Sequence, residues 1–215
     1  MNDADTNADA AEVAPGDSTD AGESSAPAKA ALRRRIRTAR RAAPPDPTRA
    51  QTLATSVLAH PVVEGHLTDS GGVAACYVSL PWEPPTSVLR QRLRAAGAEV
   101  LLPVADPHGG LTWVLDDGTA GAAWGVPGQP DAPPTPATAT EGATRAAVVI
   151  VPALAATSDG RRLGQGGGYY DRFLADLPPA SEGGPLLVAV VGPGELLPDL
   201  PTEPHDRRVD VVIVG

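Results

Sequence analysis

The sequence predicts a single α/β domain built on buried, mostly parallel strands. Short apolar runs rich in valine, leucine and isoleucine recur along the chain, as expected for strands that are covered on both faces. Two of these runs are separated by a helical pattern, so that residues 71–104 form a βαβ unit. The 215 residues are enough to bury a substantial core within one domain.

The first 28 residues are predicted to be a disordered acidic tail. They carry seven acidic residues and no basic residue. Large apolar side chains are almost absent from them, so little burial is available to offset the entropy lost on ordering. The whole chain carries a net charge of −9, and the part that follows the tail therefore carries only −2.

A strongly basic helix is predicted to follow at residues 29–43. Leu32 and Ile36 recur at helical spacing and form a narrow apolar seam. Four cations stack along one side of the same helix, namely Lys29, Arg33, Arg37 and Arg40. This basic stripe is either a solvated face or a surface that meets polyphosphate, and the spacing alone favours the solvated face. Lys29 is the single lysine among 17 basic residues.

The next elements alternate between helix and strand. A second helix is predicted at residues 48–60 and is stopped by Pro61. It is followed by a strand at 71–78, a helix at 86–97 and strands at 98–104 and 111–115. Thr86 is the predicted N-cap of its helix, and Gly97 is the predicted C-terminal stop. Cys76 lies in an apolar run and is predicted to be a small buried hydrophobe.

Residues 116–145 are a low-complexity stretch of glycine, alanine, proline and threonine. This stretch is too long for an ordinary connection between elements. We interpret it as a long loop within one domain rather than a linker, because further buried strands follow and need neighbours. These strands are predicted at 146–152, 186–191 and 209–214.

Composition excludes several classes of function. No apolar stretch approaches the roughly 20 residues that span a bilayer, and the N-terminus lacks the pattern of a signal peptide. The net charge of −9 argues against nucleic acid as the main partner. The single cysteine excludes an intramolecular disulfide. We therefore expect a soluble, cytoplasmic protein whose main partner is neither a membrane nor nucleic acid. A monomer is expected as well, although composition does not determine the oligomeric state.

A glycine-rich loop at residues 164–168 separates the strand 146–152 from a helix that begins at Tyr169. Glycines at such a crossing let the backbone approach a ligand, and their amide N–H groups favour phosphate. The loop is not a Walker A motif, because no Gly-Lys-Ser/Thr follows, and it fits the dinucleotide fingerprint poorly. A phosphate loop and a flexible surface turn both remain open on this pattern alone.

The residues that flank the glycines favour a phosphate site. Arg162 precedes them, and Tyr169, Tyr170 and Asp171 follow. A guanidinium can clamp phosphate oxygens, an aromatic ring can stack on a heterocycle, and a carboxylate can hold Mg²⁺ beside polyphosphate. Alternatively, Asp171 complements the helix dipole and the tyrosines are ordinary core residues.

These residues resemble the 5-formyltetrahydrofolate cyclo-ligases, also called methenyltetrahydrofolate synthetases. The matching motif is Arg162-Leu163-Gly164-x-Gly166-x-Gly168-Tyr169-Tyr170-Asp171. Over roughly residues 29–215 the order of the other pieces agrees. They are Lys29, Leu32 and Arg33 in the first helix; Tyr77, Ser79, Glu83 and Thr86 after a strand; and Pro201, Glu203, His205 and Asp206 in a loop before the last strand.

The resemblance implies a three-layer α/β/α sandwich and a reaction that consumes ATP. In this reaction 5-formyltetrahydrofolate is closed to 5,10-methenyltetrahydrofolate, and ADP and phosphate are released. The formyl oxygen first takes the γ-phosphoryl group, the nitrogen at position 10 adds to the activated carbon, and phosphate leaves. Mg²⁺ is the implied cofactor, and ATP is the co-substrate.

The resemblance also implies the residues of the site. The implied ATP-binding residues are Lys29, Arg33, Arg162, Leu163, Gly164, Gln165, Gly166, Gly167, Gly168, Tyr169 and Tyr170. The implied folate-binding residues are Glu83, Gln165, Gly166, Gly167, Gly168 and Tyr169. Within these sets, Arg162, Gly166 and Tyr170 are expected to act at the reacting groups. Asp171 and Asp206 are the implied ligands of Mg²⁺.

The sequence departs from the family pattern at a few positions. Val88 stands where some members carry a second glutamate, and Ala156-Thr157 replaces a common Phe-Asp. The usual Glu-Pro of the central loop corresponds at best to Gln129-Pro130. Trp113 and Trp124 are candidates for lining the folate pocket, with ordinary packing as the alternative. The histidines lack the spacing of metal ligands; they are His60, His66, His108 and His205.

Three other hypotheses stay open. One is a different ATP- or phosphosugar-using α/β enzyme whose glycine loop converged on this pattern. Another is a nucleic-acid-binding module that uses the arginines of residues 33–41, with the acidic tail as an internal competitor. The third is a divergent homologue that binds folate without turnover, which Val88 and Thr157 suggest.

Overall fold

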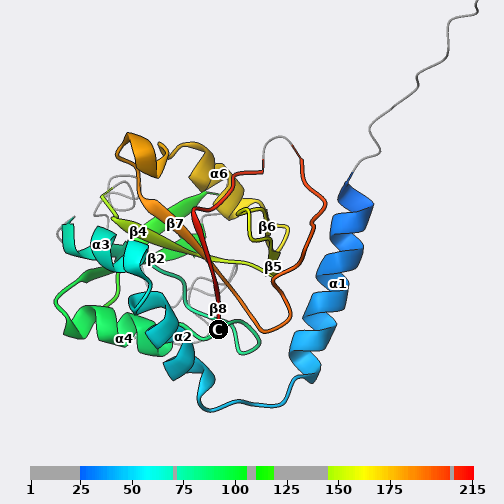
Figure 1. Ribbon diagram of the computed structural model, residues 1–215, viewed down its shortest axis with the longest axis horizontal. Helices are drawn as coiled ribbons and strands as arrows, with labels where there is room; N and C mark the ends of the chain where they lie inside the picture. The colour runs from blue at the N-terminus through cyan, green and yellow to red at the C-terminus, as the bar shows by residue number, and fades with distance from the viewer. Residues whose placement is uncertain (1–24, 70–71, 106–109, 119–144, 204–205) are drawn as a thin grey trace, which may run out of the picture.

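The computed structural model describes residues 25–69, 72–105, 110–118, 145–203 and 206–215 (Figure 1). The described elements are α1 (Ala26–Ala42), α2 (Arg49–Leu58), α3 (Pro61–Asp69), β1 (Val73–Ala75), α4 (Ser87–Ala95), β2 (Glu99–Ala105), β3 (Leu111–Leu115), β4 (Val148–Pro152), β5 (Ala155–Ala156), β6 (Arg162–Leu163), α6 (Tyr169–Ala175), the 3-10 helix η1 (Ala180–Glu182), β7 (Leu186–Val191) and β8 (Val211–Val214).

Within the described residues, the central sheet has six strands in the order β3-β2-β1-β4-β7-β8. All neighbouring strands are parallel except β3, which pairs with β2 in the antiparallel direction. The predicted βαβ unit is confirmed, because β1 and β2 are parallel neighbours joined through α4. The predicted α/β class with a mostly parallel sheet is therefore confirmed.

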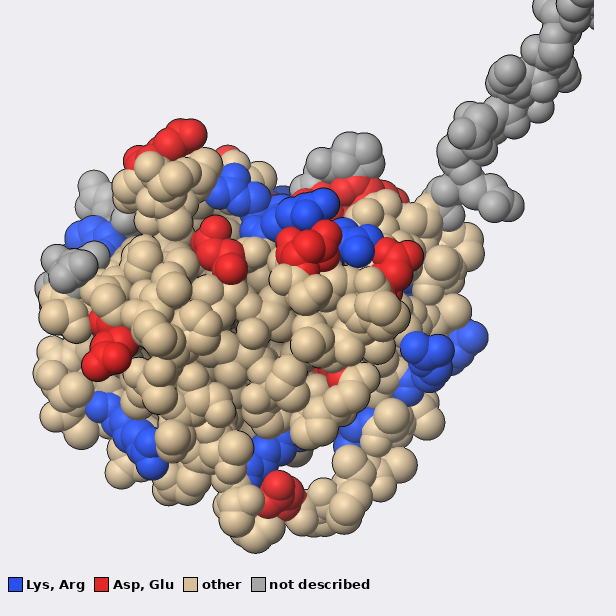
Figure 2. Space-filling view, in the orientation of Figure 1, with Lys and Arg blue, Asp and Glu red and all other residues tan. Residues whose placement is uncertain are grey.

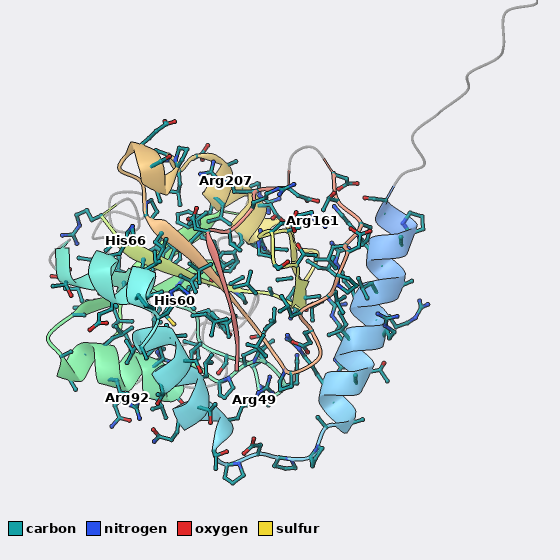
Figure 3. All side chains as sticks on the ribbon, viewed as in Figure 1. Arg49, His60, His66, Arg92, Arg161 and Arg207 are labelled. Atoms are coloured by element: carbon teal, nitrogen blue, oxygen red, sulfur yellow. The ribbon has the colours of Figure 1, made fainter. Side chains whose placement is uncertain are left out.

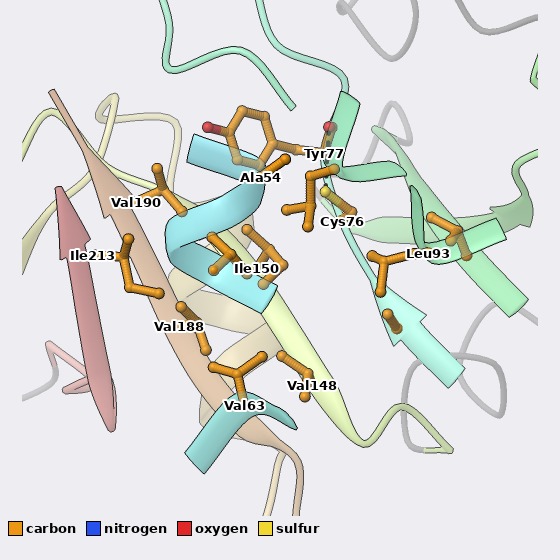
Figure 4. Close-up of a cluster of buried hydrophobic side chains, with 14 of the residues drawn as sticks. Ala54, Val63, Cys76, Tyr77, Leu93, Val148, Ile150, Val188, Val190 and Ile213 are labelled. Carbon is orange, nitrogen blue, oxygen red and sulfur yellow. Dashed lines mark hydrogen bonds between the residues drawn. The ribbon is translucent and has the colours of Figure 1, made fainter. Parts of the chain in front are cut away.

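Helices cover both faces of the sheet. On one face, α2, α3 and α4 bury a core that includes Leu53, Val63 and Leu89 against the strands. Figure 4 draws part of this core, where Ile150 and Val188 lie between the sheet and these helices. On the other face, Leu174 of α6 packs on a second core built from the same strands. The expected three-layer α/β/α arrangement is thus present.

Helix α1 lies at the side of the sandwich, apart from the α2–α4 layer (Figure 1). Its apolar seam packs against the small β5–β6 hairpin and the segment near Leu200, and the buried member of the seam is Ile36. Leu32, the other predicted seam residue, is partly buried against the same cluster. The predicted helix is confirmed, although it begins three residues before Lys29.

One local prediction is wrong, and a second is confirmed in position only. Pro61 does not simply stop the second helix, because it is the first residue of α3 and α2 ends at Leu58. Proline suits the first helical position, where its missing N–H has no helical partner. Thr86 occupies the N-cap position of α4, but its hydroxyl does not cap the helix. Instead it donates to the carbonyl of Tyr77 at 2.6 Å and ties the helix start to the segment after β1.

Some predictions fall on residues outside the described part of the chain. They are the acidic tail over residues 1–24, the low-complexity loop over residues 119–144 with Trp124, Gln129 and Pro130, and the histidines His108 and His205. Within the described residues, none of the helices has both the length and the apolar character needed to cross a bilayer.

Candidate active site

The candidate site lies where the direction of chain winding changes in the sheet. Strands β1 and β4 are neighbours, but β1 continues to β2 on one side and β4 continues to β7 on the other. In open α/β sheets, ligands bind at such a switch point, outside the carboxyl ends of the strands. The segment after β1 carries Glu83, and the segment after β4 leads to the glycine loop. Fold topology therefore brings these two segments together.

A cavity of about 230 Å³ opens at this position. The glycine loop and its flanking residues form one wall, and Glu83, which accepts a hydrogen bond from Gln165 of that loop, contributes a buried carboxylate to a second wall. The remaining surface is largely apolar and comes from the ends of several strands. These apolar residues are Val78, Leu80, Pro103, Ala105, Leu111 and Pro152. Such a cavity, apolar with a few convergent polar groups, suits a flat organic ligand.

The glycine loop turns tightly beside this cavity. Gly166 has a φ of +98° and Gly168 has a φ of +70°. Residues other than glycine rarely adopt these backbone angles. A Cβ atom on Gly166 would lie 3.4 Å from the Arg33 side chain, and one on Gly168 would lie 2.7 Å from Nη1 of Arg172. Both positions therefore favour glycine for reasons of local geometry.

The basic stripe of α1 faces the protein and not the solvent. Arg33 Nε donates to the carbonyl of Gly164 at 3.0 Å, and Arg37 Nε donates to Oε1 of Gln165 at 3.1 Å. Arg40 pairs with Glu195 through Nε at 2.7 Å and Nη2 at 2.6 Å. The prediction of a solvated basic face is wrong, because local spacing could not reveal these distant acceptors. The stripe is also not free to serve as a nucleic-acid surface.

Lys29 begins the stripe in a buried position between two carboxylates. Its Nζ donates to Oε2 of Glu203 and to Oδ2 of Asp206, each at 2.7 Å, and only 6% of the residue is exposed. Burial by itself would lower the pKa of Lys29, but the hydrogen bonds and charges of Asp206 and Glu203 outweigh it and raise that pKa. Lys29 is therefore held as a cation by Glu203 and Asp206, and it does not line the cavity beside the glycine loop.

Arg162 and Tyr170 place polar groups at the glycine wall. Arg162 Nη2 donates to Oδ1 of Asp171, and its Nε is buried without a hydrogen-bond partner among the described residues. The Tyr170 hydroxyl is likewise buried and unpartnered within the described part of the chain. Burial raises the pKa of Tyr170 well above its ordinary value, so this hydroxyl stays protonated. Tyr170 also packs against the second core, as the alternative interpretation held, and it lines the cavity.

Glu83 is the buried acceptor of the site. Its Oε1 accepts from Nε2 of Gln165 at 2.8 Å, and its Oε2 accepts from the backbone N–H of Leu80 at 3.0 Å. An ionised carboxylate offers about four acceptor directions, so two remain for a ligand. Nearby, the Tyr77 hydroxyl donates to the carbonyl of Pro84 at 2.9 Å and fixes the segment that carries Glu83.

The two aspartates implied as Mg²⁺ ligands each hold a cation of the protein. Asp171 pairs with Arg162 and Asp206 pairs with Lys29. Among the described residues, no group of three or more His, Cys, Asp or Glu is arranged to hold a metal. Mg²⁺ beside polyphosphate commonly takes only one or two protein carboxylates, with phosphates and water completing its shell. Asp171 lines the cavity and is 37% exposed in its side chain, so its carboxylate fits an ion held mainly by a nucleotide. Asp206 does not line this cavity and lies with Glu203 and Arg162 at a second depression of the surface.

Two residues raised as possible folate contacts lie elsewhere. Trp113 is 3% exposed, and its ring packs 4.9 Å from that of Phe173 in the second core. Packing is therefore its role, as the alternative interpretation held. Val88 is partly buried against the first core and does not line the cavity.

Thr157 is buried at the start of a turn that ends at Arg161. Its hydroxyl donates to Asp159 and accepts from the backbone N–H of Arg161 at 3.1 Å. The Arg161 guanidinium, labelled in Figure 3, also forms ion pairs with Asp159 and Asp199. Figure 2 shows acidic and basic side chains lying side by side over this part of the surface. The substitution of the family's usual aspartate by Thr157 thus leaves a hydrogen-bonded turn in place.

The sequence interpretation missed three features of the site. Arg37 and Arg40 were not assigned roles beyond the stripe, and the link from Gln165 to Glu83 was not anticipated. These contacts join residues that are between 82 and 155 positions apart. The only local signal was the unusual run of cations on one helix side, which shows that a surface is charged but not what it contacts.

Comparison with known proteins agrees with this arrangement. A family model described as the 5-formyltetrahydrofolate cyclo-ligase family matches residues 25–215. The chain is 36% identical over 151 residues to a 5-formyltetrahydrofolate cyclo-ligase of Mycolicibacterium smegmatis, which covers 67% of this chain and 74% of that protein.

Two solved structures share the fold. One is a 5,10-methenyltetrahydrofolate synthetase from Mycoplasma pneumoniae, with a TM-score of 0.57, 17% identity, and coverage of 86% of this chain and 97% of the other. The second is a 5,10-methenyltetrahydrofolate synthetase from Aquifex aeolicus, with a TM-score of 0.61, 20% identity, and coverage of 86% and 89%.

Proposed function

The chain belongs to the 5-formyltetrahydrofolate cyclo-ligase family, and we propose that it closes 5-formyltetrahydrofolate to 5,10-methenyltetrahydrofolate with ATP as co-substrate. Membership of the family makes the chain a cyclo-ligase. The use of ATP, the phosphorylated intermediate, the involvement of Mg²⁺ and the roles of individual residues are the proposed part. A cytoplasmic location and a monomeric state are proposed with them.

The observation that carries this proposal is the sharing of one cavity by the glycine loop and Glu83. Backbone N–H groups of a glycine loop suit the oxygens of a triphosphate. The Glu83 carboxylate suits the N–H donors of the folate ring, and the apolar residues between these two walls suit its flat face. The two substrates would thereby meet with their reacting groups close together.

The proposed chemistry makes the formyl oxygen a good leaving group. This oxygen attacks the γ-phosphorus of ATP, the bond from that phosphorus to the β-phosphate bridging oxygen breaks, and ADP departs. The nitrogen at position 10 then attacks the activated carbon and loses its proton. Finally the bond between that carbon and the phosphorylated oxygen breaks, and phosphate leaves with the methenyl product formed.

The residues of the chain act mainly by positioning and by electrostatic stabilisation. Arg162 would stabilise the charge that develops on the transferred phosphoryl group, and Gly166 would let the phosphates approach the backbone. The protonated hydroxyl of Tyr170 can donate to an oxygen of either substrate. Lys29 and Arg33 would contact ATP phosphates from α1, while Tyr169 closes the wall of the cavity.

Asp171 and Asp206 are the residues that would hold Mg²⁺ with the nucleotide. The ion would supply charge neutralisation and orientation of the γ-phosphate. To bind the metal, Asp171 would have to give up its ion pair with Arg162, and Asp206 would have to give up its ion pair with Lys29. Arg162 and Lys29 would then be released toward the phosphates.

A direct assay tests the proposed function. Purified protein is mixed with 5-formyltetrahydrofolate and MgATP, and the growth of methenyl absorbance is followed. We expect growth that requires both ATP and folate, together with stoichiometric release of ADP and phosphate. Folded protein that binds 5-formyltetrahydrofolate but gives no methenyl absorbance would favour the folate-binding homologue without turnover.

A further inference from the structure

A chain of three side chains runs from α1 to the buried carboxylate of the site. Arg37 Nε donates to Oε1 of Gln165 at 3.1 Å, and Arg37 Nη2 donates to the backbone carbonyl of the same residue. Gln165 Nε2 in turn donates to Oε1 of Glu83 at 2.8 Å. The chain thus connects three segments that are distant in sequence, namely α1, the glycine loop and the segment after β1.

The direction of this chain is fixed by the chemistry of its two ends. A guanidinium can only donate hydrogen bonds, and an ionised carboxylate can only accept them. The amide of Gln165 must therefore turn its oxygen to Arg37 and its NH₂ group to Glu83. A flipped amide would set NH₂ against the guanidinium and oxygen against the carboxylate. Arg37 thus determines which end of the Gln165 amide meets Glu83.

We propose that Arg37 is a positioning residue for the folate: acting through Gln165, it holds the Glu83 carboxylate in the orientation that accepts the N–H donors of the folate ring. The inference rests on the proposed function. Glu83 is 7% exposed, so water does little to hold its carboxylate, and its orientation depends on the donors of the protein. These donors are Gln165 on Oε1 and the Leu80 N–H on Oε2.

The other cations of the stripe have different partners. Lys29 contacts Glu203 and Asp206, Arg33 contacts the carbonyl of Gly164, and Arg40 contacts Glu195. Arg37 is therefore the member of the stripe whose contacts lead to Glu83. Arg34 lies on the exposed side of the same helix, which makes it a matched control for loss of one arginine from α1.

The test is a double-mutant cycle on binding of 5-formyltetrahydrofolate, with Arg37→Met, Gln165→Leu and the double variant. Loss of a hydrogen bond to a charged group predicts about tenfold weaker binding in each single variant. Because Arg37 acts through Gln165, the double variant should bind no more weakly than Gln165→Leu alone. Arg34→Met should bind as the wild type does. In turnover, KM for the folate should rise while kcat changes little, since ground state and transition state use the contact equally.

Two results would overturn the inference: unchanged folate binding in Arg37→Met, or losses that add in the double variant. A second variant guards against a folding defect in α1. Gln165→Glu keeps an acceptor for Arg37 but removes the donor to Glu83, so it should weaken folate binding at least as much as Gln165→Leu. Retained binding in this variant would also count against the positioning role.

A separate measurement distinguishes failure of the inference from failure of the proposed function. In ligand-free protein, the side-chain NH₂ signals of Gln165, identified by their loss in Gln165→Glu, should shift in Arg37→Met but not in Arg34→Met. If wild-type protein neither binds nor converts 5-formyltetrahydrofolate, the proposed function fails and the folate role of Arg37 fails with it. If wild-type protein converts the folate and Arg37→Met binds it normally, only the inference fails.

Discussion

The ammonium of Lys29 lies 2.7 Å from Oδ2 of Asp206, although the two residues are 177 positions apart. The proposed function gives them different partners, an ATP phosphate for Lys29 and Mg²⁺ for Asp206. In the ligand-free arrangement they satisfy each other, and Glu203 shares the same ammonium. Binding of nucleotide with its metal therefore has to replace this ion pair, which links the affinities for ATP and Mg²⁺.

Lys29→Arg should weaken ATP binding by about tenfold although the charge is kept. Lysine is a compact point charge, whereas arginine is a planar fork with a different reach. Lys29 is buried between two carboxylates that it contacts with one nitrogen, and a fork in that space would displace them. Titration of ATP binding in the presence of Mg²⁺ is the measurement, with Arg35→Lys on the exposed side of α1 as control. Equal ATP affinity in Lys29→Arg and wild type would mean that the position needs only a cation.

Arg40→Met should lower the free energy of unfolding by about 3–5 kcal/mol, because it leaves a largely buried carboxylate without its partner. Arg40 donates to both oxygens of Glu195 and to the carbonyl of Ala153, so it anchors the end of α1 to the body. Arg41 is the matched control, since it lies over the ring of Trp82 on the surface and should contribute about 0.5–1 kcal/mol. Urea unfolding of both variants measures the difference. Similar losses in the two variants would contradict an anchoring role.

The regular elements of the fold were predictable because their signals are local. Buried strands such as β4 and β7 are continuous apolar runs, and α4 has a helical pattern that ends at a glycine. The β5–β6 hairpin was not predicted, since strands of two residues are too short to show a period. The start of α3 was missed because proline reads equally as a stop and as a first helical residue.

The site was predictable only in part, for a related reason. The glycine loop and its neighbours form one contiguous motif, and the structure gathers Arg162, Gly166 and Tyr170 at one cavity. The partners of the α1 cations are determined by tertiary contacts. The sequence of residues 29–43 contains no signal that Arg40 contacts the Glu195 carboxylate or that Arg33 contacts the Gly164 carbonyl. Local spacing therefore favoured the wrong alternative for that helix face.

Asp116→Asn should destabilise the protein by about 3 kcal/mol at neutral pH, because Arg90 would remain buried without this carboxylate. Burial alone would raise the pKa of Asp116, but donors from Arg90, Arg94 and the Gly118 N–H outweigh it and hold the pKa below the ordinary 3.8. A carboxyl whose pKa is lowered on folding contributes stability above 3.8, and that contribution is lost as pH falls through the lowered value. The difference between wild type and variant should therefore shrink below pH 3.8.

The measurement is urea unfolding of both proteins over a series of pH values. Glu99→Gln is the control, since Glu99 forms an exposed pair with Arg145 that should contribute less than about 1 kcal/mol. A difference for Asp116→Asn that stays constant with pH would show that the ionised carboxylate is not what stabilises this region.

Gly166→Val should reduce ATP affinity strongly while the protein still folds. The φ of +98° at this position imposes strain of the order of 1–3 kcal/mol on a residue with a side chain. The branched side chain would also lie against Arg33 and stand where phosphates approach the loop. Gly65→Ala in α3 is the matched control, since a Cβ atom there meets nothing within 4 Å. Near-normal ATP affinity in Gly166→Val, measured by titration, would show that the glycine loop does not bind the nucleotide.

Asp171→Asn and Asp206→Asn should each lower turnover by roughly a hundredfold and raise the Mg²⁺ concentration needed for half-maximal rate, since metal-held charge neutralisation is worth several kcal/mol in phosphoryl transfer. An asparagine keeps the size of the side chain but loses the charge that binds the ion. Asp171→Asn also frees Arg162 from its ion pair, whereas Asp206→Asn leaves Lys29 paired with Glu203, so the two variants should differ in ATP affinity. Turnover titrated with Mg²⁺ at fixed ATP separates the two effects, because only a ligand of the metal shifts the Mg²⁺ dependence.

The control is Asp176→Asn, which changes an exposed residue at the end of α6 and should leave both turnover and the Mg²⁺ dependence unchanged. If Asp171→Asn lowers the rate with an unshifted Mg²⁺ dependence, the role of Asp171 is to hold Arg162 and not the metal.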